Sequence, residues 1–298
     1  MRNIIICLLA LSALALVDGC GGRKNAASDD GGIIYVTTIR PVGAIMEKVV
    51  GERAEVVCLL QPGASPHTYA PRPSDIRRVE RASALICVGG GLDAWAVDFS
   101  VRKKIALMEL LPAEYRLRMA EHVYGGHGDG VIDPHFWLDP LAVKAVLPKL
   151  AEILCGIDPE GGEIYRANAA GFGRELDALH EELRAALLPV KGRPVFLFHP
   201  SMNYLLKRYG LEFTGVIERF AGRDPSAAER IELIEKIKAA GAKAIFTEPQ
   251  LPEDTALSLA QDAGVEVGTL YPIGGVEGRD TYSDLLRYNA RILVEYLK

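Results

Sequence analysis

The chain has 298 residues, of which 49% are hydrophobic and 24% charged, a composition of globular proteins that excludes a disordered or collagen-like chain. This length is sufficient for two globular units. The formal net charge is −5 and no long basic run is present, so we expect no nucleic-acid partner.

The first residues carry the pattern of a secretory signal. An apolar run from Ile4 to Val17 is too short to cross a bilayer core, which requires about 20 residues. It leads into Val17-Asp18-Gly19-Cys20, which resembles the processing box of bacterial lipoproteins, in which the cysteine is acylated. We therefore predict a signal peptide over residues 1–19 and a lipid on Cys20. A cleaved signal followed by an incidental cysteine is the alternative.

Residues 20–32 are predicted to form a lipidated, flexible tether, because they contain several glycines and no large apolar side chain that could be buried. The protein is then expected outside the cytoplasm, at the cell surface or in the periplasm, and anchored to a membrane. Which membrane leaflet holds the anchor is left open by the sequence.

The remaining cysteines allow at most one disulfide. After loss of Cys7 with the signal and acylation of Cys20, the remaining ones are Cys58, Cys87 and Cys155. Because three is an odd number, at least one thiol stays unpaired.

From residue 33 onward the chain alternates two kinds of segment. Short apolar runs bounded by Gly or Pro are typical of buried parallel strands. Runs with helical periodicity separate them. The predicted strands cover 33–38, 55–61, 84–88, 194–198, 244–247 and 265–270, and the predicted helices cover 41–50, 74–81, 201–209, 225–240 and 254–263. This alternation predicts an α/β fold with two parallel sheets.

One long amphipathic helix is predicted between the two halves. Residues 163–188 place apolar side chains three, four or eight residues apart, with Glu and Arg on the other face. We expect an N-terminal lobe over 33–160, a linking helix over 161–189 and a C-terminal lobe over 190–298. A single rigid helix between lobes limits hinge motion.

Common catalytic and phosphate-binding motifs are absent from the sequence, including G-x-x-x-x-G-K-[ST], G-x-G-x-x-G, G-x-S-x-G and H-E-x-x-H. The informative residues are histidines. His67 follows the predicted strand 55–61, and His199 ends the predicted strand 194–198. Because ligands bind beyond the carboxyl ends of parallel strands, these two should face a crevice from the two lobes.

A third histidine, His135, lies in a rigid Asp133-Pro134-His135 segment before a helix. Three neutral imidazoles that converge on a cleft are suitable ligands for Zn²⁺. The alternative is three ordinary hydrogen-bonded histidines, since their spacings of 68 and 64 residues match no local metal motif.

Five strings, in this order, resemble the zinc- and manganese-binding solute receptors of ABC transporters. They are P-G-A-S-P-H-T-Y (62–69), D-P-H-F-W-L-D-P (133–140), F-H-P-S-M-N-Y-L (198–205), I-F-T-E-P-Q (245–250) and Y-S-D-L-L-R-Y-N (282–289). The resemblance implies two α/β lobes joined by a long helix, with a metal cleft between them. It also implies that the metal ligands are His67, His135 and His199.

The resemblance further implies a protein that performs no reaction. Its expected role is to capture Zn²⁺ as a transported ligand and to deliver it to an ABC permease, as a monomer. Three alternatives stay open: a manganese or iron receptor of the same family, a zinc hydrolase with three histidine ligands, and an adhesin or scaffold with a structural metal.

The fourth ligand is open. In these receptors it is often an Asp in the turn after the last strand, where this chain has Tyr271. A phenol is a poor ligand at neutral pH, so water or a nearby carboxylate is expected, and the loss of a carboxylate favours Zn²⁺ over Mn²⁺. The candidates are water, Tyr271, Glu248 and the loop that carries His122, His127 and Asp129. His180 is expected on a solvated helix face, and Trp95 and Trp137 are expected to pack rather than to bind.

Overall fold

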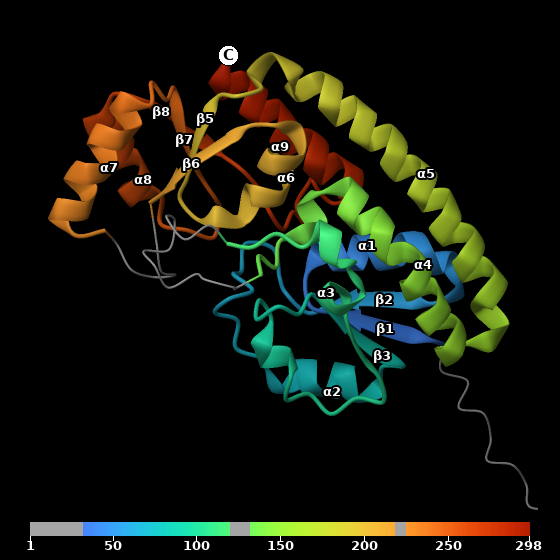
Figure 1. Ribbon diagram of the computed structural model, residues 1–298. Helices are drawn as coiled ribbons and strands as arrows, with labels where there is room; N and C mark the ends of the chain where they lie inside the picture. Colours follow the sequence, from blue (N-terminus) through green and yellow to red (C-terminus); the bar gives the residue numbers. More distant parts are fainter. Residues whose placement is uncertain (1–31, 120–131, 218–224) are drawn as a thin grey trace, which may run out of the picture. The chain divides into compact units, whose positions relative to one another are not determined.

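The computed structural model describes residues 32–119, 132–217 and 225–298 (Figure 1). The predicted signal peptide and Cys20 lie outside these residues, as do nearly all of the tether and the loop with His122, His127 and Asp129. None of the helices in the described ranges has both the length and the apolar character needed to cross a bilayer.

The first sheet has four parallel strands in the order β2-β1-β3-β4. These are β1 (Ile34–Thr37), β2 (Glu55–Cys58), β3 (Ala84–Cys87) and β4 (Lys104–Ala106), followed by the short helix α3 (Leu107–Leu110). Helix α1 (Arg40–Val50) packs on one face of the sheet, through the cluster that contains Tyr35 and Ile86. Helix α2 (Pro73–Arg81) packs on the other face, where Val79 contacts the cluster of Val36 and Leu85.

The second sheet repeats this arrangement in the order β6-β5-β7-β8, again with all strands parallel. Its strands are β5 (Pro194–Leu197), β6 (Glu212–Val216), β7 (Ala244–Thr247) and β8 (Glu266–Thr269). Helices α7 (Ala227–Ala239) and α8 (Glu253–Ala263) pack on one face, and α6 (Asn203–Tyr209) and α9 (Tyr282–Leu297) pack on the other.

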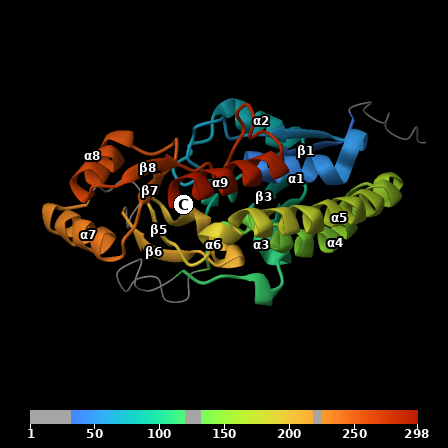
Figure 2. The ribbon, with the colours of Figure 1, turned by 90° about the horizontal axis from the view of Figure 1, so that it is seen from above.

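A single long helix, α5 (Gly162–Leu187), connects the two sheets and lies beside α4 (Pro140–Ile157), as Figures 1 and 2 show. The predicted α/β fold with two parallel sheets and one long linking helix is therefore confirmed. The helix expected after His135 is α4, whose bounds were not predicted, and strands β4 and β6 and helix α9 were not predicted at all. The sequence boundaries proposed for the lobes and the tether stay predictions.

One apolar core runs through both lobes. In the first lobe it includes Tyr35 of β1 and Leu147 of α4, and in the second lobe Leu197 of β5 and Leu293 of α9. Leu176 of the linking helix α5 belongs to the same core. A large movement of one lobe against the other would expose part of this shared core to water, which is unfavourable. The linking layer of helices therefore holds the two sheet edges that form the cleft at a nearly fixed separation.

The cysteines of the described part of the chain form no disulfide. Cys58, Cys87 and Cys155 are all free thiols. Burial raises the pKa of Cys58 to about 11 and that of Cys87 to about 12, so both stay protonated at neutral pH. They behave as small apolar side chains inside the first lobe.

Candidate metal centre

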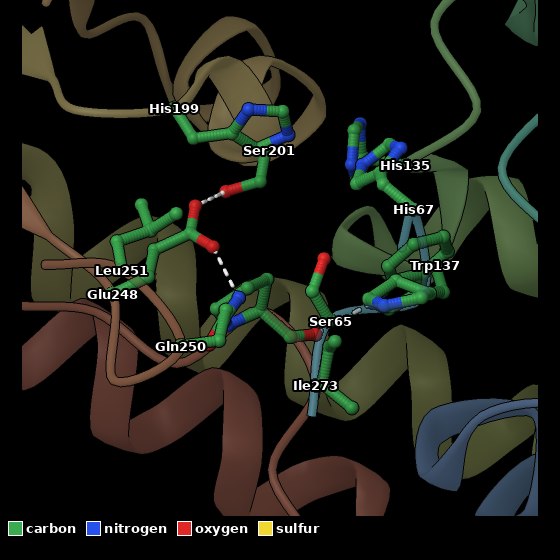
Figure 3. A pocket seen from close by; sticks show the side chains of 12 residues that line it. Ser65, His67, His135, Trp137, His199, Ser201, Glu248, Gln250, Leu251 and Ile273 are labelled. Atoms are coloured by element: carbon green, nitrogen blue, oxygen red, sulfur yellow. Dashed lines mark hydrogen bonds between the residues drawn. The ribbon is translucent and has the colours of Figure 1, made fainter. Parts of the chain in front are cut away.

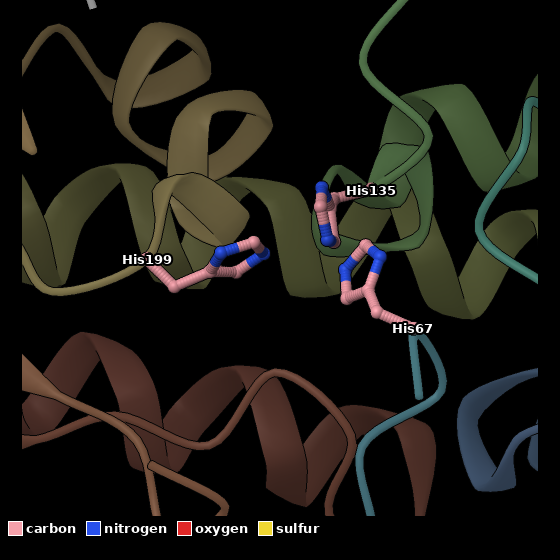
Figure 4. A group of neighbouring side chains, drawn as sticks. All are labelled: His67, His135 and His199. Carbon is pink, nitrogen blue, oxygen red and sulfur yellow. The ribbon is translucent and has the colours of Figure 1, made fainter. Parts of the chain in front are cut away.

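Three imidazoles meet in the cleft between the sheets (Figure 4). His67 lies on the loop between β2 and α2, His135 lies just before α4, and His199 directly follows Phe198 at the end of β5. Their ligand nitrogens all lie within 4.8 Å of one another. The ring centroids are 5.0 Å apart for His67 and His199, 5.5 Å for His135 and His199, and 5.8 Å for His67 and His135.

This spacing suits one metal ion in the middle. Small rotations of the rings bring the three nitrogens to the zinc–imidazole bond length of about 2.0–2.1 Å. Among the residues that the structure describes, no second group of His, Cys, Asp or Glu side chains reaches this spacing. Of the histidines in the sequence, the structure thus brings together the three that the resemblance implied.

Asp133 fixes the orientation of His135. One carboxylate oxygen, Oδ1, lies 2.8 Å from Nδ1 of His135 and also accepts the backbone N–H of His135 at 2.9 Å. The other oxygen accepts a hydrogen bond from the Asn203 amide at 3.0 Å. A carboxylate that accepts the Nδ1 proton leaves Nε2 with a lone pair for a metal. The buried Asp133 therefore presents Nε2 of His135 to the cleft.

The rest of the D-P-H-F-W-L-D-P element anchors this ligand to both lobes. Asp139 caps α4 by accepting the backbone N–H of Leu141 at 2.9 Å, and it pairs with Arg208 of α6 at 2.6 Å. The fully buried Trp137 donates its indole N–H to the Pro272 carbonyl at 2.8 Å, and its ring centroid lies 5.3 Å from that of His135. Trp137 packs as predicted, and it also lines the metal pocket, which the sequence did not indicate.

The loop that carries His67 is held on both sides of the histidine. Trp95 donates its indole N–H to the Pro66 carbonyl at 2.8 Å. The ring of Tyr69 lies 4.7 Å from the ring of Trp95, and its hydroxyl donates to Asp75 at 2.7 Å. Sequence reasoning gave Trp95 no part in the site, because no local pattern links it to a carbonyl 29 residues away.

Trp95→Phe should weaken metal binding by roughly tenfold, the lower end of the loss caused by removing groups that orient ligands. Phenylalanine keeps an aromatic ring against Tyr69 but leaves the Pro66 carbonyl without its donor. Calorimetric titration of the variant measures this. The control repeats the substitution in a His67→Ala background, where no further loss is expected because Trp95 acts through His67. An equal loss in both backgrounds would assign the effect to general destabilisation.

The imidazoles of His67 and His199 have lowered pKa values, so both rings are neutral at pH 7 before a metal arrives. Desolvation, with the neighbouring His135, lowers the pKa of His67 to about 4, although the residue as a whole remains exposed. Desolvation, with the charges of both other histidines, holds the pKa of His199 well below its usual value. Nε2 of His199 is buried and has no hydrogen-bond partner. A bound cation would satisfy this nitrogen and recover the free energy lost by burying it.

The pocket around the imidazoles is small. Its cavity volume is about 30 Å³, and its walls include Ser65, Leu251 and Ile273 (Figure 3). Since one water requires about 10–15 Å³ measured in this way, the space suits an ion with one or two waters.

A buried carboxylate, Glu248, also lines this pocket (Figure 3). It is 4% exposed, and its two oxygens accept hydrogen bonds from the Ser201 hydroxyl and the Gln250 amide. It does not belong to the group of ligand atoms that share the 4.8 Å spacing. Glu248 therefore stays a candidate that could act through a water, rather than by direct contact in this conformation.

One candidate for the fourth ligand is disfavoured by its surroundings, and one sequence expectation requires correction. Tyr271 does not line the pocket, because its ring packs at 5.2 Å against Tyr288 and lies 4.2 Å from the Arg279 guanidinium carbon. Tyr271 is therefore an unsuitable fourth ligand. His180 is not on a fully solvated face, since its side chain is 18% exposed and its ring stacks on Tyr209 at 5.6 Å.

The chain is similar to known metal-binding proteins over most of its length. The chain is 33% identical over 298 residues to the high-affinity zinc uptake system protein ZnuA of Paracoccus denitrificans, with 88% of this chain and 91% of that protein covered. It is 27% identical over 305 residues to the manganese-binding lipoprotein MntA of Halalkalibacterium halodurans, with 100% and 99% covered.

Among solved structures, a crystal structure of ZnuA superimposes with a TM-score of 0.79 and 28% identity, and covers 90% of this chain and 100% of that one. The family model described as the periplasmic component A of the zinc-uptake complex, ZnuA, matches residues 36–296. The resemblance found in the sequence is thus confirmed, and the chain belongs to the ZnuA family of periplasmic metal-binding components of metal-uptake systems.

Proposed function

We propose that this protein is an extracytoplasmic receptor that binds Zn²⁺ with His67, His135 and His199 and delivers it to an ABC permease. The convergence of three imidazoles on one small cavity is the observation that carries this proposal. An all-nitrogen set of protein ligands suits Zn²⁺, whereas Mn²⁺ is better suited by carboxylate and carbonyl oxygens. Because one chain supplies all three imidazoles, we propose that the monomer is the functional unit.

The choice of zinc as the bound metal goes beyond the family assignment, because the relatives of this chain are named for different metals. One relative is named as a zinc uptake protein and another as a manganese-binding lipoprotein. No carboxylate of the described residues joins the three imidazoles at ligand spacing. Among the described residues the fourth position is then left to water, with Glu248 as the acidic residue that lines the pocket, and the loop with His122, His127 and Asp129 stays a candidate outside them.

The same geometry argues against a zinc hydrolase. A cavity of about 30 Å³ is far smaller than the roughly 300–1,000 Å³ of sites that bind organic molecules. The carboxylate of Glu248 accepts hydrogen bonds from Ser201 and Gln250, which favours its use as a fixed acceptor over its use as a general base. We propose that the protein performs no catalysis.

Elemental analysis tests the proposed cargo. Protein purified without chelators should contain about one zinc per chain, and a chelator should remove it and leave the protein folded and able to rebind zinc. Unfolding on removal would instead indicate a structural metal. Protein that carries manganese or iron in place of zinc would contradict the choice of cargo.

We further propose that Cys20 carries a lipid that anchors the mature protein to the membrane on its extracytoplasmic side. Cys20→Ser should move the protein from the membrane fraction to the soluble exported fraction, because a lipid anchor holds by its buried acyl chains. Fractionation followed by immunoblotting measures this. A Cys20→Ser protein that still fractionates with membranes would contradict acylation at this residue.

A further inference from the structure

One segment of the first lobe has a charge opposite to that of the whole chain. Residues 72–104 contain seven Arg and Lys against four Asp and Glu, in a chain with a net charge of −5. Two of those acids, Asp75 and Asp93, are buried, each with 3% of its surface exposed. Both accept hydrogen bonds inside the lobe. The exposed acids of the segment are Glu80 and Asp98. The net charge of the exposed side chains of this segment is therefore more positive than the net charge of the whole segment.

Besides Arg72, five exposed cations of this segment lie without a carboxylate at ion-pair distance in the described part of the chain. We call them the basic edge: Arg77, Arg81, Arg102, Lys103 and Lys104. Several exposed Arg and Lys side chains elsewhere pair with acids, such as Lys144 with Asp177 and Arg166 with Glu152, whereas the unpaired ones of this segment follow one another closely in the chain. Exposed cations that the fold leaves unpaired are available to an external anion.

The basic edge lies at the edge of the first sheet where its parallel strands begin. The backbone N–H of Ser83, two residues after Arg81, donates to the Ile34 carbonyl of β1 at 2.8 Å. The Lys103 carbonyl accepts the N–H of Leu85 at 2.9 Å, so the start of β4 lies at the same edge. In a parallel sheet all strands begin on one edge, and Arg77 is one helical turn away from Arg81 on α2. Helix α2 lies on the face of this sheet that is turned away from α5 (Figure 1).

Two exposed apolar side chains accompany the cations. Ile76 is 42% exposed and precedes Arg77, and Val97 is 67% exposed. The Lys104 amine donates to the Val97 carbonyl, which places Val97 beside the basic edge. Cations interspersed with exposed aliphatic side chains form the kind of surface that contacts the headgroup layer of a membrane.

We propose that the basic edge binds the anionic phospholipid headgroups of the membrane that holds the anchor. This rests on the proposed acylation of Cys20, since about 12 residues separate that cysteine from Ile33 and can span at most roughly 40 Å. The tether thus keeps the basic edge close to the headgroups. The metal site lies beyond the carboxyl ends of the strands, at the opposite edge of the sheet, so it stays open to solvent when the basic edge is occupied.

The interaction is electrostatic and therefore weak for each side chain, additive over the five and sensitive to salt. The rest of the chain is acidic and is repelled by the same surface, which orients the molecule on the membrane. The tether raises the local concentration, so a weak contact is sufficient to set this orientation.

Vesicle sedimentation tests the proposal with mature Cys20→Ser protein, which has no acyl chain. It should bind vesicles of phosphatidylglycerol and phosphatidylcholine at low salt, and lose at least tenfold in affinity on pure phosphatidylcholine or when salt is raised to physiological levels. The variant Arg77→Glu, Arg81→Glu, Lys103→Glu should lose at least tenfold on the anionic vesicles.

A matched variant, Lys149→Glu, Arg174→Glu, Lys238→Glu, has the same net charge change at exposed positions elsewhere and should bind like the parent. Zinc titration checks that each variant is folded, and Arg77→Gln with Arg81→Gln provides a milder substitution in the same place. Equal binding to neutral and anionic vesicles, or equal losses in the two triple variants, would overturn the proposal. Neither outcome affects the zinc site or the acylation of Cys20, which the titration and the fractionation test separately.

Discussion

His135→Ala should weaken zinc binding by more than about 100-fold, and His67→Ala and His199→Ala should do the same. Loss of a group that only orients a ligand costs about 10–100-fold in metal affinity, and loss of the ligand itself should cost more. No other imidazole of the described residues lies close enough to replace any of the three. Competition titration with a zinc chelator measures each dissociation constant.

His180→Ala provides the control for these variants. Its ring stacks on Tyr209 on the side of α5, so its loss should affect packing but leave zinc affinity unchanged. An unchanged affinity in any one of the three ligand variants would remove that histidine from the site. A large loss in the His180 variant would show that the measured effects report on folding.

Asp158→Asn should lower the free energy of unfolding by about 2 kcal/mol at neutral pH, measured by urea unfolding of metal-free protein. Arg53 donates two hydrogen bonds to the two carboxylate oxygens of Asp158, both at 2.8 Å, and the Tyr165 hydroxyl donates a third at 2.6 Å. These partners, with Arg53 first, lower the pKa of Asp158 from 3.8 to about 2. The carboxyl is 6% exposed, so water screens it little.

The lowered pKa of Asp158 also predicts how the stability difference between parent and variant changes with pH. Because the folded protein holds the carboxyl at the lower pKa, its contribution is complete above the ordinary pKa of about 4 and is lost as the pH falls through about 2. The difference between parent and variant should therefore shrink below pH 5. Asp177→Asn, at an exposed pair with Lys144, should change stability little at any pH. A difference for Asp158→Asn that stays constant down to pH 3 would contradict the assignment.

The amphipathic helix over 163–188 and the apolar strands were predictable because burial imposes a period that the sequence displays. Strand β4 was not, since its three residues begin with an exposed lysine and offer no alternation. Strand β6 contains Gly215, whose close approach to the Phe196 ring explains the glycine but removes a strand signal. Helix α4 contains Pro148, which weakens a helical pattern although the helix continues through it.

The ends of two predicted strands already indicated that His67 and His199 face a crevice, but the assignment of all three histidines as metal ligands rested on the family resemblance. The three histidines are far apart in the sequence. No periodicity of the local sequence shows that the segments beside β2, α4 and β5 bring them within ligand distance. The residues that orient them were harder to foresee. Trp95 reaches Pro66, and Trp137 reaches Pro272, by single hydrogen bonds between distant segments. Tyr271 stayed an open candidate for the same reason, because its stacking on Arg279 depends on how the last loop folds.

The most direct test of the zinc assignment is a pair of dissociation constants, for Zn²⁺ and for Mn²⁺, measured by competition on metal-free protein at one pH. Three imidazoles with no carboxylate of the described residues at ligand spacing, together with the general order of divalent metal affinities, predict that Zn²⁺ binds more tightly by orders of magnitude. Equal affinities, or tighter binding of Mn²⁺, would contradict the account and would require oxygen ligands that the three-histidine site does not contain.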